Sequence, residues 1–486
     1  MADKEYIIRR ITRDAFLREA CSSASALGLR LYAVGGLVRD MLLKRPSVRD
    51  YDLAVDRDAR GLAMMLAGDI GAAAFPLDLG LGSFRVAKKT PHGIVTIDVA
   101  PFNGRTIVGD LKKRDFTINA VAINAAEVFE KKRLSFIDPC RGIEDLEKGV
   151  LRAVSVKAFD QDPLRTLRAA RFSHQFGLEI ERGTLRLVRE KSHLLSRVSW
   201  ERIRDEFSLI FSYPRTVNGL KLLFDLKMID AIAPECAWAN KGYNLKAHSL
   251  KTVSEAEKLM RWMNGGDAKG PWVKARHILS EQGAGLQNSA ILKMLCFLHD
   301  AGKPLTMKME EGRLRFIGHE VEGSLLVKGL LKRLRFSRRS SAIISGLVKD
   351  HHRAFMLLNL KKLSFRAKAH FFRATGGVGG ILLLLCSLAD ARATRAGEDK
   401  RLFALVTKML DFYFKVYIVK RPPPLLNGHE VMRIFKMPQG RLVGEVLSKI
   451  SEAVQQGIVK DKKGAVQFIK DWLSRINAQE FGLQKD

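Results

Sequence analysis

Cysteine is scarce in this sequence, and a long apolar segment is absent. The five cysteines are widely scattered, form no CxxC pair and are odd in number, so they fit no closed disulfide framework and predict a reducing, cytoplasmic location. The longest apolar run, residues 379–388, is shorter than the roughly 18 residues of a membrane span and predicts a buried helix. The first fourteen residues are charged throughout, which is not the pattern of a signal peptide. We therefore expect no membrane partner.

Acidic residues are outnumbered. The chain has 83 Lys and Arg against 52 Asp and Glu, a formal net charge of +31. Solubility alone needs a net charge of only about 2 to 8 on a small domain. An excess of this size favours a polyanionic partner such as nucleic acid.

The hydrophobic pattern predicts an α+β protein in several parts. Short β-rich runs at 31–34, 52–55 and 94–99 alternate with a helix at 38–44, and apolar residues then recur at three and four from Pro163 to about Asp230. Glycine-containing stretches at 263–270 and 376–380 interrupt a second helical block, and the run Pro422–Pro424 introduces a last helical segment. The predicted parts are an N-terminal extension (1–30), an α/β head with a mixed sheet (31–153), a helical neck (154–238), a histidine-containing helical domain (239–396) and a helical C-terminal region (397–486).

The most informative stretch is residues 34–53, VGGLVRDMLLKRPSVRDYDL. Gly35 and Gly36 follow a strand and open a helix, so backbone amides and the positive helix end can approach a phosphate. Arg39 lies one turn into that helix, where its guanidinium can reach a triphosphate. Asp50 and Asp52 alternate on a strand, leave the same face and can hold Mg²⁺ together. These features predict a nucleotidyl-transfer site.

A third carboxylate is expected beside the first two. Asp98, in the stretch IVTIDVA, alternates with apolar Ile97 and Val99, so it is our candidate. Two metal ions held by such carboxylates activate an attacking hydroxyl and neutralise a leaving pyrophosphate.

The order GGLVRDMLL followed by RDYDL resembles motif A of the class II nucleotidyltransferases in the polymerase-beta superfamily, which includes CCA-adding enzymes and bacterial poly(A) polymerases. The resemblance continues through most of residues 31–210. It implies a polymerase-beta-like head, Mg²⁺ as cofactor, CTP and ATP as nucleotides, and the 3′ end of tRNA as acceptor.

Two further blocks carry the resemblance. Residues 113–120, KRDFTINA, look like motif B, in which Arg114 would contact the triphosphate while Asp115 and Asn119 order the ribose and the adjoining backbone. Residues 138–152 resemble the next block, a structural hinge, although Arg141 stands where the family usually has Gly.

Residues 161–165, QDPLR, correspond to the family's nucleotide-selecting element. We expect Asp162 and Arg165 to share one face of a helix, where an acceptor beside a donor matches the Watson–Crick edges of cytosine and adenine but not those of uracil and guanine. Gln161 replaces the usual Glu and would orient Arg165 less strongly. Arg168 and Arg171 continue the stripe toward phosphate or RNA, the alternative being a solvated helix face. We interpret the following block, which begins at residues 201–204, as structural.

Histidines form a second constellation. Six residues occur in the order that HD-domain phosphohydrolases use, and they resemble its metal site, with a divalent transition metal or Mg²⁺ as the expected ion. They are His248, His299, Asp300, His319, His351 and Asp390. A His351-His352 doublet leaves the ligand open, and its spacing to Arg353 favours His351. The alternative is a set of capped or surface histidines.

The sequence thus predicts a template-independent tRNA nucleotidyltransferase that transfers CMP, and AMP as a further option, with an added phosphohydrolase activity. A poly(A) polymerase is disfavoured because residues 82–85 are GSFR, whereas those enzymes usually carry Gly-Arg-Arg/Lys-Phe there. An HD hydrolase with an inactive RNA-binding head is the alternative of another class. The short connector at residues 100–110 predicts addition of CC only, since full CCA-adding relatives carry a longer flexible loop there. Oligomeric state stays open.

Overall fold

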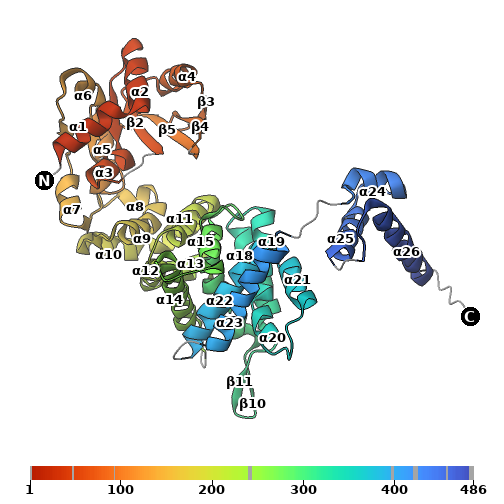
Figure 1. The fold of residues 1–486 in the computed structure, drawn as a ribbon. Helices are drawn as coiled ribbons and strands as arrows, with labels where there is room; N and C mark the ends of the chain where they lie inside the picture. Colours follow the sequence, from red (N-terminus) through yellow and green to blue (C-terminus); the bar gives the residue numbers. More distant parts are fainter. Residues whose placement is uncertain are drawn as a thin grey trace, which may run out of the picture. The chain divides into compact units, whose positions relative to one another are not determined.

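The computed structural model describes residues 3–45, 49–91, 93–238, 243–395, 399–419, 425–455 and 458–480 of the chain. They form two compact units, one made of residues 1–236 and 330–337 and the other of residues 237–329 and 338–486 (Figure 1). The predicted run Pro422–Pro424 lies outside the described residues.

The head of the first unit contains a seven-stranded mixed sheet of order β3-β4-β5-β2-β1-β6-β7. Among its described strand pairs, β2 with β5 is parallel and the others are antiparallel. Its strands are β1 (Leu31–Val34), β2 (Asp50–Val55), β3 (Ala73–Asp78), β4 (Ser83–Thr90), β5 (Gly93–Pro101), β6 (Ala122–Ile123) and β7 (Phe136–Ile137). The predicted α+β head and its strands at 31–34, 52–55 and 94–99 are confirmed. The helix predicted at 38–44 begins earlier, as α3 (Gly35–Leu42).

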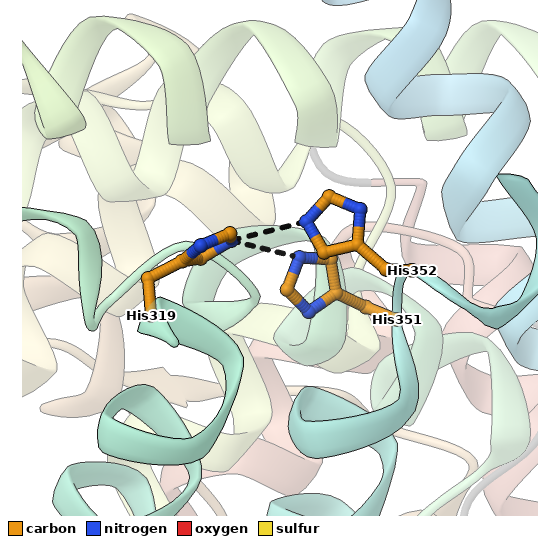
Figure 2. A group of neighbouring side chains, drawn as sticks. All are labelled: His319, His351 and His352. Carbon is orange, nitrogen blue, oxygen red and sulfur yellow. Dashed lines mark hydrogen bonds between the residues drawn. The ribbon is translucent and has the colours of Figure 1, made fainter. Parts of the chain in front are cut away.

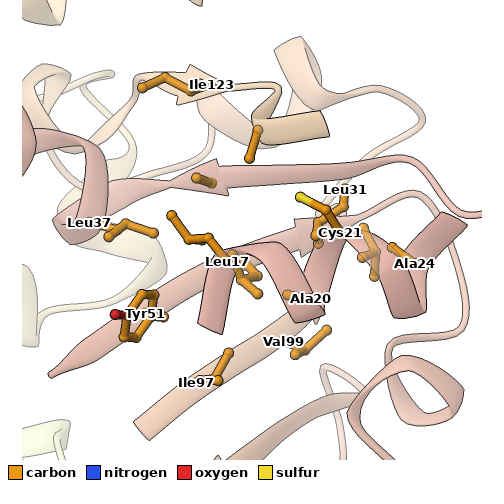
Figure 3. Close-up of a cluster of buried hydrophobic side chains, with 14 of the residues drawn as sticks. Leu17, Ala20, Cys21, Ala24, Leu31, Leu37, Tyr51, Ile97, Val99 and Ile123 are labelled. Atoms are coloured by element: carbon orange, nitrogen blue, oxygen red, sulfur yellow. The ribbon is translucent and has the colours of Figure 1, made fainter. Parts of the chain in front are cut away.

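The residues predicted as an N-terminal extension belong to the head itself. They form α1 (Lys4–Arg13) and α2 (Ala15–Ala26), whose buried side chains share one core with the sheet and with α4 (Ala59–Ile70). Figure 3 shows Leu17 and Cys21 of α2 among the same buried side chains as Ile97 and Val99 of β5. The two helices pack on the head because their apolar stripe covers sheet residues that would otherwise face water.

Helices predominate after the head, as predicted for the neck. A small parallel ribbon of β8 (Val150–Leu151) and β9 (Glu179–Ile180) joins them. The central helix is α9 (Leu164–Phe176), which packs against α11 (Trp200–Ser212) and α12 (Thr216–Asp225). The others are α8 (Ala158–Gln161), α10 (Arg182–Lys191), η2 (Ser192–Arg197), α13 (Met228–Ile232) and η3 (Pro234–Cys236).

The second unit is built around α22 (Val378–Thr394), which packs against α14 (Leu245–Asn264) and α16 (Asn288–Leu298). Residues 380–389 of α22 are all buried, which confirms the prediction that the apolar run is a core helix. Surrounding elements are α15 (Pro271–Ser280), α17 (Lys303–Thr306), β10 (Lys308–Glu310), β11 (Arg313–Arg315), α18 (His319–Arg333), α19 (Arg338–Asp350), α20 (Arg353–Leu358), α21 (Phe365–Ala374), α23 (Lys400–Phe412) and η4 (Tyr413–Tyr417).

Among the described residues no single helix is both long and apolar enough to cross a membrane, while the bent pair α21 and α22 meets the criteria of length and composition together.

The predicted C-terminal helical region contains three helices with a core of their own. These are α24 (Gly428–Phe435), α25 (Arg441–Gln455) and α26 (Lys462–Glu480). Val431, Val446 and Ile469 are buried together in that core.

Candidate functional sites

Three carboxylates lie on one face of the head's sheet. Asp50 and Asp52 alternate on β2, and the parallel register places Asp52 beside Asp98 of β5 and Asp50 beside Thr96. Side chains at paired positions of neighbouring strands share a face, so the three predicted catalytic carboxylates are brought together. The Thr96 hydroxyl donates to Asp50 at 2.5 Å, and Asp50 itself is exposed. One carboxylate of the group is therefore open to solvent.

Arg85 of β4 forms an ion pair with Asp98. Its Nε and one terminal nitrogen each donate to a different oxygen of Asp98 at 2.7 Å, a bidentate ion pair. Arg85 belongs to the GSFR stretch, which the sequence analysis used only to separate two enzyme types. Asp98 thus lies where a third carboxylate was expected, but with both oxygens bound to a guanidinium.

The Gly35-Gly36 turn closes over Asp52. The amide of Gly36 donates to Asp52 Oδ2 at 2.9 Å, and Gly35 has φ of +63°. A β-carbon added at Gly35 would lie 2.7 Å from a nitrogen of Arg114 and 3.1 Å from Asp52 Oδ2. Larger residues are excluded here by space and by backbone conformation. The turn therefore keeps space open between the Asp52 carboxylate and the Arg114 guanidinium.

Burial raises the pKa of the Asp52 carboxyl; the charge of Arg114 opposes that effect, whereas the charge of Asp98 adds to it. A divalent cation would favour the ionised form of such a carboxylate. The donor set of hard oxygen atoms fits Mg²⁺, with Asp50 and Asp52 as the residues that would hold it.

Arg114 is fixed by the short connector. The connector leads from β5 into α5 (Ile107–Leu111), where Asp110 is buried and accepts from Arg114 Nε at 3.0 Å and from the Asn103 amide at 2.9 Å. Asp110 therefore links the connector, at Asn103, to Arg114, the residue predicted to bind the triphosphate. Sequence reasoning had not singled out Asp110.

A polar network, which we define as Arg39, Asn119, Asp115, Arg168, Glu206 and Arg171, joins the head to the neck. Arg39 donates to Asn119 at 2.6 Å, and Asn119 donates to Asp115 at 3.0 Å. Arg168 then donates to Asp115 at 2.9 Å and lies 3.4 Å from Glu206. Arg171 is buried and binds the other oxygen of Glu206. Five predicted nucleotide-binding residues are thus brought together.

Their partners differ from the predicted ones. The guanidinium of Arg39 is buried over the rings of Phe172 and Phe176 and also binds its neighbour Asp40. Arg171 faces Glu206, so it does not belong to a solvated helix face. Direct contact of these two arginines with phosphate stays a prediction, since both have internal partners in this structure.

Burial by itself would raise the pKa of Asp115. The charge of Arg168, with hydrogen bonds from Asn119 and the Phe116 amide, more than offsets burial and lowers the pKa to about 2. Asp115 is therefore ionised at neutral pH.

The expectation that Asp162 and Arg165 share one helix was wrong. Asp162 has extended backbone (φ −146°, ψ 96°) at the end of α8, and α9 begins only at Leu164. Pro163 is the physical reason, because a proline ring drives the preceding residue out of the helical region. Arg165 is on α9 and donates to the carbonyls of Lys113, Arg114 and Ala158. Those three carbonyls orient Arg165.

Arg202 is the residue that the sequence analysis missed. It lies in α11, in the block interpreted as structural, and it forms a bidentate pair with Asp162 at 3.1 and 2.7 Å. The two residues are 40 positions apart in the sequence, so no local pattern indicated the pair. Arg141 stands where the family usually has Gly. Its φ is +57°, a backbone conformation that glycine adopts without strain.

All six predicted HD residues meet in one cluster of the second unit. They come from α14, α18 and α22 and from the ends of α16 and α19. Their ligand atoms form two triads, each within 4.8 Å: His248, His299 and Asp390, and His319, His351 and His352. Figure 2 shows the second triad, in which His319 faces both rings of the doublet, with Nε2 atoms 3.3 Å from His351 and 3.1 Å from His352.

Asp300 lies between the two triads. Its Oδ2 is 3.1 Å from His248 and 3.4 Å from His299, and its Oδ1 is 3.4 Å from His319. Tyr243 and Lys303 complete its surroundings, at 2.9 and 2.6 Å. One carboxylate with an oxygen toward each triad is the arrangement of a bridging ligand, so the donor set fits two transition-metal ions.

The doublet supplies both rings, so choosing His351 alone was incomplete. His351 is held by the Val348 carbonyl through Nδ1, which leaves Nε2 facing the triad. His352 caps α20 and turns Nε2 to the same point.

Neighbouring carboxylates and imidazoles shift the pKa values of two of these histidines in opposite directions. Burial would lower the pKa of His248, but hydrogen bonds to Asp300 and Asp390 raise it to about 9. Burial, reinforced by His299 and His352, lowers the pKa of His351 to about 3. A neutral imidazole is the form that binds a metal.

Three family models match the chain: "Poly A polymerase head domain" at residues 31–152, "Probable RNA and SrmB- binding site of polymerase A" at 177–239 and "HD domain" at 247–393. An A-adding tRNA nucleotidyltransferase of Deinococcus radiodurans is 33% identical over 450 residues, covering 90% of this chain and 94% of that protein. A CC-adding tRNA nucleotidyltransferase of Geobacter sulfurreducens is 31% identical, covering 91% and 92%.

A solved CCA-adding enzyme in complex with CTP has the same fold, with a TM-score of 0.57, 20% identity and coverage of 97% and 98%. This chain thus contains the paired carboxylates, the polar network and the histidine cluster, and its relatives match it over almost their full length. The protein belongs to the class II tRNA nucleotidyltransferase family, in a form that carries an HD domain.

Proposed function

We propose that this enzyme transfers nucleotides from CTP, and in one alternative from ATP, to the 3′ end of tRNA. The observation that carries the proposal is the carboxylate face: Asp50 and Asp52 beside Arg114 and the Gly35-Gly36 turn. The names of the A-adding and CC-adding relatives support tRNA as acceptor.

Each group on this face has a chemical task. Asp50 and Asp52 would hold Mg²⁺, and the ion would supply activation of the attacking 3′ hydroxyl and charge neutralisation on the leaving pyrophosphate. Arg114 and the amides of the glycine turn bind the triphosphate. Asp98 is the third carboxylate, and in the free enzyme Arg85 neutralises it.

Base selection is assigned to Asp162 and Arg165. Arg202 holds Asp162 by two hydrogen bonds, and three main-chain carbonyls hold Arg165. The acceptor, Asp162, and the donor, Arg165, are therefore each positioned by different residues. Cytosine and adenine present the complementary donor and acceptor, whereas uracil and guanine present the reverse order.

The short connector supports addition of two cytidines without the terminal adenosine. Asp110 fixes the connector at both Asn103 and Arg114, which leaves little slack for reshaping the pocket from a pyrimidine to a purine. A-adding activity is the second candidate, favoured by the 33% identity to the Deinococcus radiodurans enzyme.

One experiment separates these functions. Transcripts of tRNA ending before CCA, after C and after CC are each given CTP, ATP or both, and products are separated at single-nucleotide length. The CC-adding proposal expects two C residues on the shortest tRNA and no reaction of tRNA-CC with ATP. Conversion of tRNA-CC to CCA with ATP contradicts it, and long A tails would identify a poly(A) polymerase.

A second proposed activity is metal-dependent hydrolysis of a phosphate ester at an RNA 3′ end, such as a 2′,3′-cyclic phosphate. Its support is the pair of histidine triads with Asp300 between them. Elemental analysis of the purified chain tests the metal centre: we expect up to two transition-metal ions per chain, and one fewer in His352→Ala. An unchanged metal content in that variant would remove His352 from the ligand set.

A further inference from the structure

A cavity of about 360 Å³ lies between α20 and α21 in the second unit and belongs to neither site described above. None of the histidines or aspartates of the metal cluster lines it. Its walls carry Arg353, Ser364, Arg366 and His370, and its apolar part includes Met356 and Phe371. The volume is in the range of small-molecule and nucleotide sites, about 300 to 1,000 Å³.

The polar wall is cationic. Arg353 forms an ion pair with Asp350, with its Nε 2.8 Å from a carboxylate oxygen, and its side chain is 39% exposed. Within the described ranges, Arg366 and His370 have no ion-pair partner, and Arg366 is exposed. Two lysines, Lys361 and Lys362, are exposed on the segment that joins the two helices. Arg366 and the two lysines thus place positive charge beside the cavity, and that charge attracts phosphate.

The start of α21 reinforces that wall. Ser364 caps the ten-residue helix by accepting from the Ala367 amide, and the positive end of the helix faces the cavity together with the two arginines. A helix N-terminus alone binds anions weakly, but here it occurs with separate guanidinium groups around one cavity.

The apolar wall is unusual for a surface. Met356 is 66% exposed although it lines the cavity beside buried Phe371. A flexible thioether next to an aromatic ring is a surface on which a nucleobase can pack. The lining of this one cavity thus combines cationic side chains that can bind phosphate with an apolar surface that can pack on a base, the two halves of a nucleotide.

The cavity is connected to the metal cluster through α20. His352 caps this helix and belongs to the second triad, and Arg353 is the next residue. We propose that the cavity binds the phosphodiester and base of single-stranded RNA next to the terminal phosphate that the HD centre hydrolyses. The enzyme therefore prefers an RNA end to a free mononucleotide. This inference rests on the proposed hydrolase function.

The test compares two substrates of the metal-loaded, full-length protein. One is 2′,3′-cyclic CMP and the other is a four-nucleotide RNA that ends in a 2′,3′-cyclic phosphate. We expect a lower KM for the RNA. Arg366→Ala should raise the KM for the RNA about tenfold, the usual effect of one lost charge-assisted contact, with kcat and the mononucleotide KM unchanged.

Arg401→Ala is the matched control, because Arg401 is an exposed arginine of α23 that does not line the cavity. Equal KM values for both substrates, or an effect of Arg366→Ala on both, would overturn the proposal. If the wild type hydrolyses neither substrate, the hydrolase function fails and binding decides. A 4-thiouridine RNA that crosslinks to residues 353–371 in wild type but not in Arg366→Ala supports the cavity, and crosslinking only elsewhere rejects it.

Discussion

The carboxylate face and the HD cluster both offer ligands for divalent cations, yet they are built in opposite ways. On the face, two strands supply the carboxylates, one of which is exposed, and arginines already neutralise part of their charge. In the cluster, five helices bring six histidines and aspartates plus His352 together, and Asp300 and His299 are 1% exposed. The face is suited to a metal that arrives with a nucleotide, and the cluster to a metal that stays.

The largest expected effect is on the carboxylate face. Asp50→Ala should reduce nucleotide transfer roughly 1000-fold or more because a metal ligand is lost, while tRNA binding through the basic surface remains. Asp50 is exposed, so the fold is retained. Incorporation of labelled CMP measures the first effect and a filter-binding titration the second. Asp78→Ala, an exposed change on β3, is the control, and full transfer by Asp50→Ala would remove Asp50 from catalysis.

The corresponding substitution in the HD cluster replaces Asp300, which lies between the two triads. Asp300→Asn should remove hydrolysis of cyclic phosphate and lower the bound metal, because an amide is a poor bridging ligand between the triads. Nucleotide addition should stay within about twofold of wild type, as the two sites use separate residues. Loss of both activities together would mean that the sites are not independent.

A smaller effect is expected on base selection. Arg202→Ala frees Asp162, and loss of that pair should reduce discrimination against UTP by about 1 to 3 kcal/mol, roughly 5- to 150-fold. Arg165→Ala should act in the same direction and also slow the reaction. Competition between CTP and UTP measures the ratio. If both variants select CTP as well as wild type does, base reading lies elsewhere.

The smallest effect concerns stability. The lowered pKa of Asp115 means that its ionised form stabilises the folded state above the unfolded pKa near 3.8, and that this contribution is lost as pH falls toward 2. The shift corresponds to about 2 kcal/mol. Asp115→Asn should therefore destabilise the protein at pH 6, and the gap to wild type should narrow by about half at pH 3. Urea unfolding at both pH values measures it, and a gap independent of pH would contradict the assignment.

Prediction from local spacing was wrong where a proline separates two helices. Spacing alone put Asp162 and Arg165 on one helix, but Pro163 forces extended backbone on Asp162 and ends that face. Similarly, the packing of α1 and α2 on the sheet was not predicted, because the surface that their apolar stripe covers is known only from the folded structure.

Partners distant in sequence were also out of reach. Arg85 with Asp98 and Arg202 with Asp162 are pairs that depend on strand register and helix packing. No periodicity specifies which guanidinium reaches which carboxylate, since both residues of a pair are compatible with many local structures.

The α+β head, the helical remainder and the paired carboxylates on one strand face follow from the sequence alone, because alternation and helical spacing are local properties of the chain. The six HD residues were predicted from the resemblance of their order to that of the HD family. Only the tertiary structure decided that the predicted phosphate-binding arginines form an internal network, that Asp300 lies between two triads and that His352 joins one of them. Those arrangements depend on which buried charges find partners when separate helices and strands pack together.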